Sequence, residues 1–177
     1  SLMQLHVENM SQDRLAGDLA RQYRLRYLPP NLNCTSNSSL TAIHFGCQAI
    51  EHNGVDLVLV GNCSKIKTQE LWFPSTQSML DSDPVQPFGE HSKGVLFAEG
   101  FSVLLLESAR HRRARQRSGG IRLQTSYMQI SAGRSNDSSW LSTSIVKVMQ
   151  QAVEKAEIAA GDLCAIIPHG NGSSISD

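Results

Sequence analysis

Residues 36–61 read SNSSLTAIHFGCQAIEHNGVDLVLVG and join two different patterns. Apolar side chains recur at helical spacing over residues 40–50, which predicts a helix that begins near Ser36 and stops at Asn53-Gly54. Residues 55–61 then form a nearly continuous apolar run. Such a run is typical of a strand that is buried on both faces, as in a parallel sheet under helices. This junction predicts an α/β fold.

The same alternation continues on both sides of this junction. An amphipathic helix is predicted over about the first 25 residues. Further along we expect a long loop with one short helix near residues 69–73 and buried strands at residues 101–106 and 163–167. A strand at residues 121–130 should carry Leu123, Thr125 and Tyr127 on one face, and helices are expected at residues 107–116 and from Ser138 or Ser139 to Gly161. Helices and strands in this order predict packed layers.

Composition limits the functions that the chain can have. Its 177 residues, of which 40% are apolar, suffice for one domain with a hydrophobic core. Sixteen basic and sixteen acidic residues balance, so no overall field attracts nucleic acid or an anionic membrane. The apolar runs are far shorter than the roughly 20 residues of a membrane helix. The first residues also lack a secretory pattern, so a cytoplasmic location is expected.

The cysteines give no sign of a metal centre. No two of them form a C-x-x-C pair, and no histidine cluster stands near them at metal-ligand spacing. We therefore expect buried free thiols, no metal and no cofactor. The four are Cys34, Cys47, Cys63 and Cys164.

Two junctions could carry chemistry. Ser36 stands at a helix start, where free backbone N–H groups and the helix dipole favour either a capping hydroxyl or a nucleophile. His169 follows an apolar run and precedes glycines, a position that suits an acid, a base or a structural histidine. Each signal is weak alone, and both readings stay open for each residue.

Residues 33–44, NCTSNSSLTAIH, resemble the nucleophile segment D-T-A-C-S-S-S-L-x-A-x-H of β-ketoacyl synthases. Matching Leu40, Ala42 and His44 to the family's pattern places Ser36 at the family's catalytic cysteine. Cys34 falls at the family's threonine, two positions too early to be that nucleophile.

Two later segments strengthen the resemblance. Residues 87–100 resemble P-F-D…G-E-G, with Gly89 in place of the aspartate. Residues 162–177 resemble D-V-D-Y-V-E-A-H-G-T-G-T-P-L-G-D, with His169 at the first catalytic histidine and Asp177 at the last position. The segment departs from the pattern at Pro168, Asn171, Ser173 and Ser174. The family's N-x-K-x-x-x-G-H segment, with its second catalytic histidine, does not occur in this sequence.

The resemblance implies a partial thiolase-like layered α/β fold that lacks N-terminal and C-terminal portions. Residues 1–177 would then form a single ketosynthase-like domain fragment. Its parts would be a nucleophile elbow near residues 33–44, a long loop at residues 64–100 and the first catalytic-histidine segment at residues 162–177.

The resemblance also implies an activity. In the family, the cysteine accepts an acyl chain from a carrier-protein thioester, and two histidines promote decarboxylation of a malonyl unit whose carbanion attacks that acyl group. Ser36 and His169 are thus the predicted catalytic residues. An alcohol without a dedicated base is a far weaker nucleophile than a thiolate, so we expect impaired condensation in fatty acid or polyketide biosynthesis. The alternatives are an active acyltransferase or malonyl decarboxylase that uses Ser36 and His169, and a silent structural subunit.

An arginine-rich run suggests a docking surface, with acyl carrier protein or an acyl thioester as the partner. A solvated helix face or nucleic-acid binding are the alternatives. The neutral chain and the lack of interleaved aromatic residues disfavour nucleic acid, and no membrane partner is expected. Unpaired strand edges further predict a homodimer. The run comprises Arg110, Arg112, Arg113, Arg115 and Arg117.

Overall fold

The computed structural model describes residues 12–26, 32–52, 54–64, 66, 71–72, 85–92, 94–130, 138–172 and 177. The chain divides into two compact units, Ser1–Ala42 and Ile43–Asp177. The first unit contains helix α2 (Gln12–Gln22), the 3-10 turn η1 (Thr35–Asn37) and the start of helix α3 (Ser38–His52). Helix α2 confirms the amphipathic helix predicted near the N-terminus over residues 12–22; residues 1–11 lie outside the described part.

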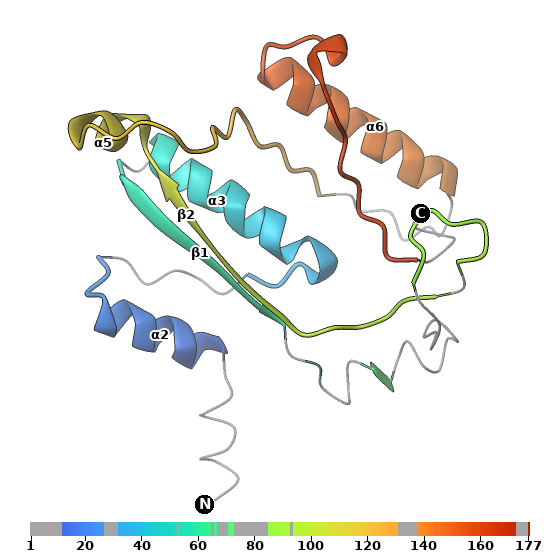
Figure 1. Ribbon diagram of the computed structural model, residues 1–177, viewed down its shortest axis with the longest axis horizontal. Helices are drawn as coiled ribbons and strands as arrows, with labels where there is room; N and C mark the ends of the chain where they lie inside the picture. Colours follow the sequence, from blue (N-terminus) through green and yellow to red (C-terminus); the bar gives the residue numbers. More distant parts are fainter. Residues whose placement is uncertain are drawn as a thin grey trace, which may run out of the picture. The chain divides into compact units, whose positions relative to one another are not determined.

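The second unit holds the strands and the later helices (Figure 1). The short helix predicted at residues 69–73 is described only at Leu71 and Trp72, which are helical. The helices and strands predicted at residues 36–54, 55–61, 101–106, 107–116 and 138 onward are present, with the following bounds: α3 continues to His52, β1 spans Leu57–Ser64, β2 spans Gly100–Glu107, α5 spans Ala109–Ala114, α6 spans Ser138–Lys155 and the 3-10 turn η2 spans Ala160–Asp162.

Helix α3 packs on one face of a two-stranded ribbon. Strands β1 and β2 pair antiparallel, from Leu57 opposite Glu107 to Ser64 opposite Gly100. Gly46 of α3 lies so close to this ribbon that an added Cβ would come within 2.7 Å of the Leu106 Cδ1 atom and 3.3 Å of a Val58 methyl group. The glycine therefore sets how closely the helix approaches the strands.

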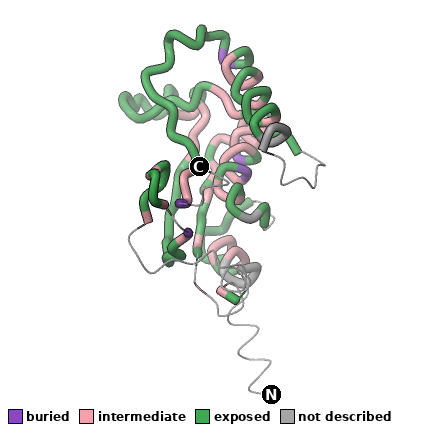
Figure 2. The backbone as a smooth tube through the Cα atoms, turned by 90° about the vertical axis from the view of Figure 1, so that its right-hand side faces the viewer, coloured by how far each residue is buried: buried purple, intermediate pink, exposed green. Residues whose placement is uncertain are grey.

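On the opposite face of the ribbon, the apolar side chains of β2 are largely exposed. Phe101, Val103 and Leu105 are 76%, 70% and 58% exposed, and Figure 2 shows the exposed class along most of the described strands. The prediction of parallel strands buried on both faces is thus wrong for this pair. Its apolar residues face α3 on one side, and the side chains of β2 on the other side are largely exposed.

An extended segment at residues 121–130 connects α3 to α6. The Ser126 hydroxyl lies 2.9 Å from the His44 Nδ1 atom of α3, and the Ser126 carbonyl accepts a hydrogen bond from Lys155 Nζ at 3.3 Å. Gln124 adds a hydrogen bond to the carbonyl of Ala156, a residue that is only 7% exposed. These contacts place the segment between the two helices.

Two predicted strands and one helix end need correction. Residues 121–130 and 163–167 have no strand pairing in the described part of the chain, and Ile167 is 95% exposed. Apolar sequence alone does not make a strand, because a strand needs a neighbour to take its backbone hydrogen bonds. Helix α6 ends at Lys155 rather than at Gly161, and Glu157 just beyond it has the left-handed φ of 55° typical of a helix terminus.

Candidate functional site

Ser36 lies in the turn that leads into helix α3. The turn is closed by a hydrogen bond from the Asn37 amide to the Cys34 carbonyl at 3.2 Å, and the Ser38 hydroxyl accepts the Cys34 amide at 2.9 Å. The exposed Ser36 side chain therefore stands at the positive end of a long helix. This location would stabilise negative charge that develops on a group held there.

His169 is exposed on the extended segment that follows η2. The backbone just after it lies on the turn at residues 85–92, where the Ser92 hydroxyl donates to the Gly172 carbonyl at 2.5 Å. Ser36 belongs to the first unit and His169 to the second. That both face one cleft therefore stays a prediction.

Asp177 was noted in the sequence only as the last position of a motif, yet its carboxylate has a definite structural role. It accepts hydrogen bonds from the backbone amides of Phe88, Asn171 and Gly172. The signal in the sequence was the motif match itself, which gave no indication that Phe88 would be a partner.

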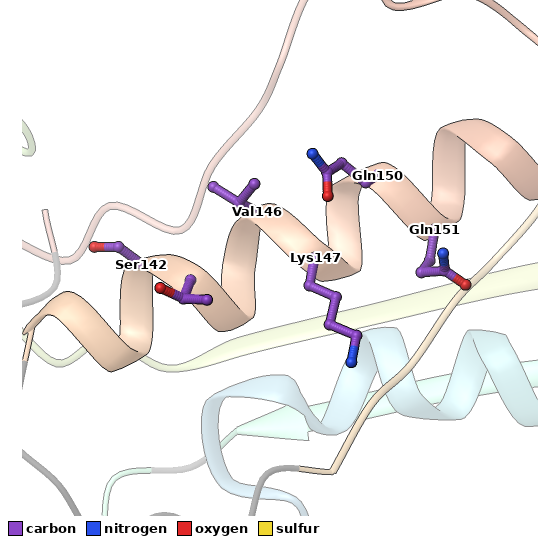
Figure 3. A pocket seen from close by; sticks show the side chains of 6 residues that line it. Ser142, Val146, Lys147, Gln150 and Gln151 are labelled. Carbon is purple, nitrogen blue, oxygen red and sulfur yellow. The ribbon is translucent and has the colours of Figure 1, made fainter.

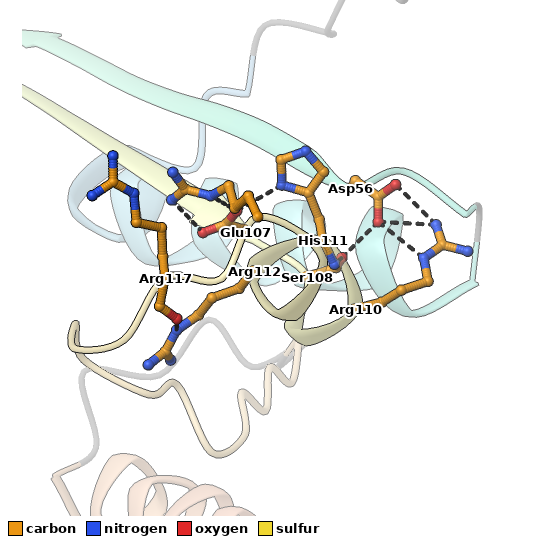
Figure 4. Close-up of polar contacts among 8 residues, drawn as sticks. Asp56, Glu107, Ser108, Arg110, His111, Arg112 and Arg117 are labelled. Atoms are coloured by element: carbon orange, nitrogen blue, oxygen red, sulfur yellow. Dashed lines mark hydrogen bonds and ion pairs between the residues drawn. The ribbon is translucent and has the colours of Figure 1, made fainter.

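Two of the five arginines are bound within the protein. Arg110 forms a bidentate ion pair with Asp56, with both carboxylate oxygens 2.9 Å from Nη2 (Figure 4). Ser108 donates to the same carboxylate at 2.6 Å and also caps α5 by accepting the His111 amide. The hydrogen bonds from Ser108 and then from Arg110 hold the pKa of Asp56 below its usual value.

Arg115 is bound to Glu107 at the end of β2. Its Nε and Nη2 atoms donate to the two carboxylate oxygens at 2.5 and 2.9 Å, and His111 Nδ1 lies 2.6 Å from Oε1. Only 14% of the Glu107 side chain is exposed. Hydrogen bonds from Arg115 and then His111 lower the pKa of Glu107 from 4.5 to about 2. Sequence reasoning missed Asp56 and Glu107, although the spacing of Glu107 and His111 is that of a helical pair.

The other three arginines lie outside these two ion pairs. Arg112 reaches the backbone carbonyl of Arg117 at 3.4 Å, which folds the chain after α5 back on itself. Within the described residues, the guanidinium groups of Arg112, Arg113 and Arg117 form no ion pair with a carboxylate. They are the members of the predicted docking set that remain able to bind a partner.

Cys47 of α3 is a half-buried thiol. Burial, followed by the nearby Glu51 carboxylate, raises the pKa of the Cys47 thiol, which keeps it protonated and a poor nucleophile. None of the four cysteines forms a disulfide among the described residues, and the expected burial is wrong for Cys34 and Cys164, which are exposed. No cluster of three or more metal-ligating side chains occurs among the described residues. Within the same residues, no helix is both long and apolar enough to cross a bilayer.

A depression on α6 contains none of the predicted site residues. All of its lining side chains come from this one helix, so it is a helix surface rather than a cleft between elements (Figure 3). It does not contribute to the candidate site. The lining residues are Ser142, Thr143, Val146, Lys147, Gln150 and Gln151.

Comparison with known proteins identifies the family. The model of the β-ketoacyl synthase N-terminal domain matches residues 7–112, more than half of the chain. The chain belongs to the β-ketoacyl synthase family. Its relatives are ketosynthase-containing proteins of the polyketide synthase type.

Two curated relatives show how low the sequence identity within the family is. The pikromycin polyketide synthase component PikAII of Streptomyces venezuelae is 25% identical over 147 residues, which are 80% of this chain and 4% of that protein. The highly reducing polyketide synthase dmxL2 of Cryptosporiopsis sp. is 30% identical over 95 residues, or 52% of this chain and 4% of that protein. The chain thus spans about one twenty-fifth of the length of these relatives.

Solved structures confirm the thiolase-like fold as a partial one. The ishigamide ketosynthase/chain length factor shares 22% identity at a TM-score of 0.70, covering 95% of this chain and 41% of that one. The oxazolomycin ketosynthase domain OzmH KS7 of Streptomyces albus shares 22% identity at a TM-score of 0.76, covering 94% of this chain and 30% of that one. A type II ketosynthase solved in complex with its acyl-carrier protein, AntDE:AntF, shares 18% identity at a TM-score of 0.76, covering 97% of this chain and 44% of that one.

Proposed function

We propose that this chain is the central part of a ketosynthase-like protein that binds acyl-carrier thioesters, decarboxylates malonyl units and is impaired in condensation. The observation that carries the proposal is Ser36, which lies in the turn before α3 at the position that matches the family's nucleophilic cysteine. The start of α3 brings the positive end of a helix dipole next to Ser36, and the family match predicts a thiol where this chain has a hydroxyl.

The oxygen of Ser36 explains the impaired step. A thiol with an ordinary pKa near 8.5 can be deprotonated at a helix start, whereas an alcohol needs a base to remove its proton during attack. Among the described residues, no histidine or carboxylate side chain forms a hydrogen bond with the Ser36 hydroxyl. Acyl transfer to this residue should therefore be slow.

His169 can act without the nucleophile. Its imidazole would donate a hydrogen bond to the thioester oxygen of a malonyl unit while the carboxylate leaves as CO₂. The electron pair of the broken C–C bond then passes into the enolate, whose oxygen the same donor stabilises. Protonation of the enolate carbon by water gives an acetyl thioester. The exposed imidazole, presented next to glycines, is accessible to such a substrate.

The acyl chain would arrive on an acidic carrier protein, and we assign the docking surface to Arg112, Arg113 and Arg117. One structural relative was solved with its acyl-carrier protein, which supports this class of partner. The three guanidinium groups are not engaged by carboxylates in the described chain and could pair with acidic side chains or a phosphate.

A homodimer is the proposed state of the protein. The support is the bare apolar face of the β1–β2 ribbon and its two open edges among the described residues. Apolar area of this kind is stabilised by a covering partner, and oligomers of identical subunits are the commonest solution.

The proposal is tested with the complete protein that contains this chain. Incubated with malonyl- and acyl-carrier thioesters, it should release acetyl-carrier thioester but form little 3-oxoacyl product, and His169→Ala should remove most of the release. Mass spectrometry of the carrier protein reads both products. Condensation at a rate equal to decarboxylation would instead favour the second candidate, an acyltransferase in which the exposed Ser36 hydroxyl is acylated.

A further inference from the structure

The carboxylate of Asp177 connects two segments that lie far apart in the sequence. Its Oδ2 atom accepts the amide of Phe88 at 2.9 Å and that of Gly172 at 3.1 Å, while Oδ1 accepts the amide of Asn171 at 3.0 Å. Hydrogen bonds to an ionised acceptor are stronger than those between neutral groups. One side chain thus satisfies amides on both the turn at residues 85–92 and the loop that follows His169.

The glycines of that loop show the same attachment independently. A Cβ on Gly170 would come within 2.5 Å of the Phe88 ring and 2.9 Å of the Pro87 side chain. Gly172 has a φ of 88°, and a Cβ there would collide with the Gly94 carbonyl. The backbone after His169 therefore lies directly against the turn, in a position that larger residues could not adopt.

The turn itself needs support at Phe88. This residue has a left-handed φ of 61°, which L side chains rarely adopt, next to the hydrogen bond from the Gly89 amide to the Gln86 carbonyl at 2.8 Å. The Phe88 amide donates to Asp177, so the carboxylate holds the turn in this conformation. The Phe88 ring in turn forms the surface on which Gly170 rests.

We propose that Asp177 is a positioning residue for His169: its carboxylate fastens the loop at residues 170–172 to the turn at Phe88 and so fixes the direction from which the imidazole is presented. The inference rests on the role proposed for His169 above. A donor that must meet a developing oxyanion loses effect when its position varies by even a fraction of an ångström.

The test is Asp177→Asn in the complete protein. Asparagine keeps the shape but turns one acceptor into an NH₂ donor that faces backbone amides. Hydrogen exchange at the amides of Phe88, Asn171 and Gly172 should then speed up by about tenfold or more, because a charged hydrogen-bond partner is lost. The kcat for malonyl-thioester decarboxylation should fall about tenfold while KM changes by less than about twofold.

The matched control is Asp18→Asn, the same change at an exposed carboxylate of α2 that pairs with Arg21. It should leave exchange and kcat unchanged. Unaltered exchange at the three amides in Asp177→Asn would overturn the attachment, and faster exchange with an unaltered kcat would overturn the positioning role. Failure of the proposed function is seen separately, as equal rates for His169→Ala and the unaltered protein. In that case the exchange at the three amides alone decides whether Asp177 holds the loop.

Discussion

Cys34 and Ser36 lie on the same turn, two residues apart, and the sulfur stands at the earlier position. The Cys34 amide donates to the Ser38 hydroxyl, so its backbone belongs to the entry of the turn rather than to the helix start. A thiol there lacks the position that the family match gives to Ser36. Under the proposed function, we therefore expect acyl transfer to depend on the order of these two side chains rather than on the presence of a cysteine.

The lowered pKa of Glu107 predicts that the stability of the protein decreases in acid. Its pKa is lowered by the Arg115 and His111 that face it, to about 2 from 4.5. A lowered folded-state pKa stabilises the protein above pH 4.5, and this contribution is lost as the pH falls from 4.5 toward 2. The free energy of unfolding, measured by urea titration at several pH values, should therefore decline over this window.

Glu107→Gln should flatten that decline, because the amide does not titrate. The control is Glu154→Gln, at an exposed glutamate of α6 that accepts a hydrogen bond from neutral Gln151. It should leave the pH profile unchanged. An equal slope for Glu107→Gln and the unaltered protein would show that the Glu107 cluster does not contribute in this range.

The residue patterns foresaw some of these features and missed others. Helical spacing over residues 40–50 predicted α3 because the apolar face of a helix depends only on residues three or four positions apart in the sequence. The ion pairs of Asp56 and Glu107 were missed because Asp56 stands 54 residues from its partner Arg110, and the pairing depends on how β1 and β2 align. The same holds for Asp177, whose partner Phe88 is 89 residues away.

Helix α5 divides the arginines into two functional groups. Arg110 and Arg115 attach the helix to the ends of β1 and β2. Arg113 and Arg117 are exposed, and Arg112 is half-buried with a hydrogen bond to the Arg117 carbonyl. Alanine at Arg112, Arg113 and Arg117 should weaken binding of acyl-carrier protein about tenfold at low salt, with little effect on thermal stability. The loss should shrink as salt screens the charges. Titration calorimetry at two ionic strengths measures this.

The anchors serve as the internal comparison. Arg110→Ala and Arg115→Ala should lower the melting temperature of the protein, because each leaves a carboxylate without its ion-pair partner. If alanine at Arg112, Arg113 and Arg117 lowers the melting temperature while Arg110→Ala and Arg115→Ala weaken carrier-protein binding, the proposed roles of the two groups of arginines are contradicted. Shift assays with oligonucleotides test the nucleic-acid alternative, for which we expect no sequence-independent binding at physiological salt.

The strands show where local sequence stops being sufficient. The apolar runs at residues 55–61 and 101–106 form β1 and β2 because they pair with each other. Residues 121–130 and 163–167 also carry apolar side chains but stay extended without pairing among the described residues, since a strand is defined by a neighbour that sequence patterns do not identify. Strand direction was predicted wrongly for the same reason.

At the scale of the whole molecule, the bare face of the ribbon predicts association. Val103 is 70% exposed on this face, next to Phe101 and Leu105. Val103→Lys should shift the protein toward the monomer, as measured by light scattering across a range of concentrations. Ser102→Lys is the matched control, at the adjacent exposed position on the other face of β2, and should leave the oligomeric state unchanged. A strictly monomeric unaltered protein would contradict the proposed homodimer.

The family assignment and the partial thiolase-like fold are the parts of the account that sequence motifs predicted best. They succeeded because several short segments, at residues 33–44, 87–100 and 162–177, match in order. The arrangement of Ser36 relative to His169 depends on how the two units meet, which motif order does not determine.

The central claim is that Ser36 occupies the acyl-accepting position of a ketosynthase site and fails there because it is an alcohol. Intact-mass measurement of the complete protein after incubation with an acyl-carrier thioester tests it most directly. A Cys34→Ser background removes the exposed thiol nearby. In this background, Ser36→Cys should gain one acyl mass, while the Ser36 protein and Ser36→Ala should remain unmodified. No adduct on Ser36→Cys, or an adduct that forms equally well on Ser36→Ala, would contradict the account.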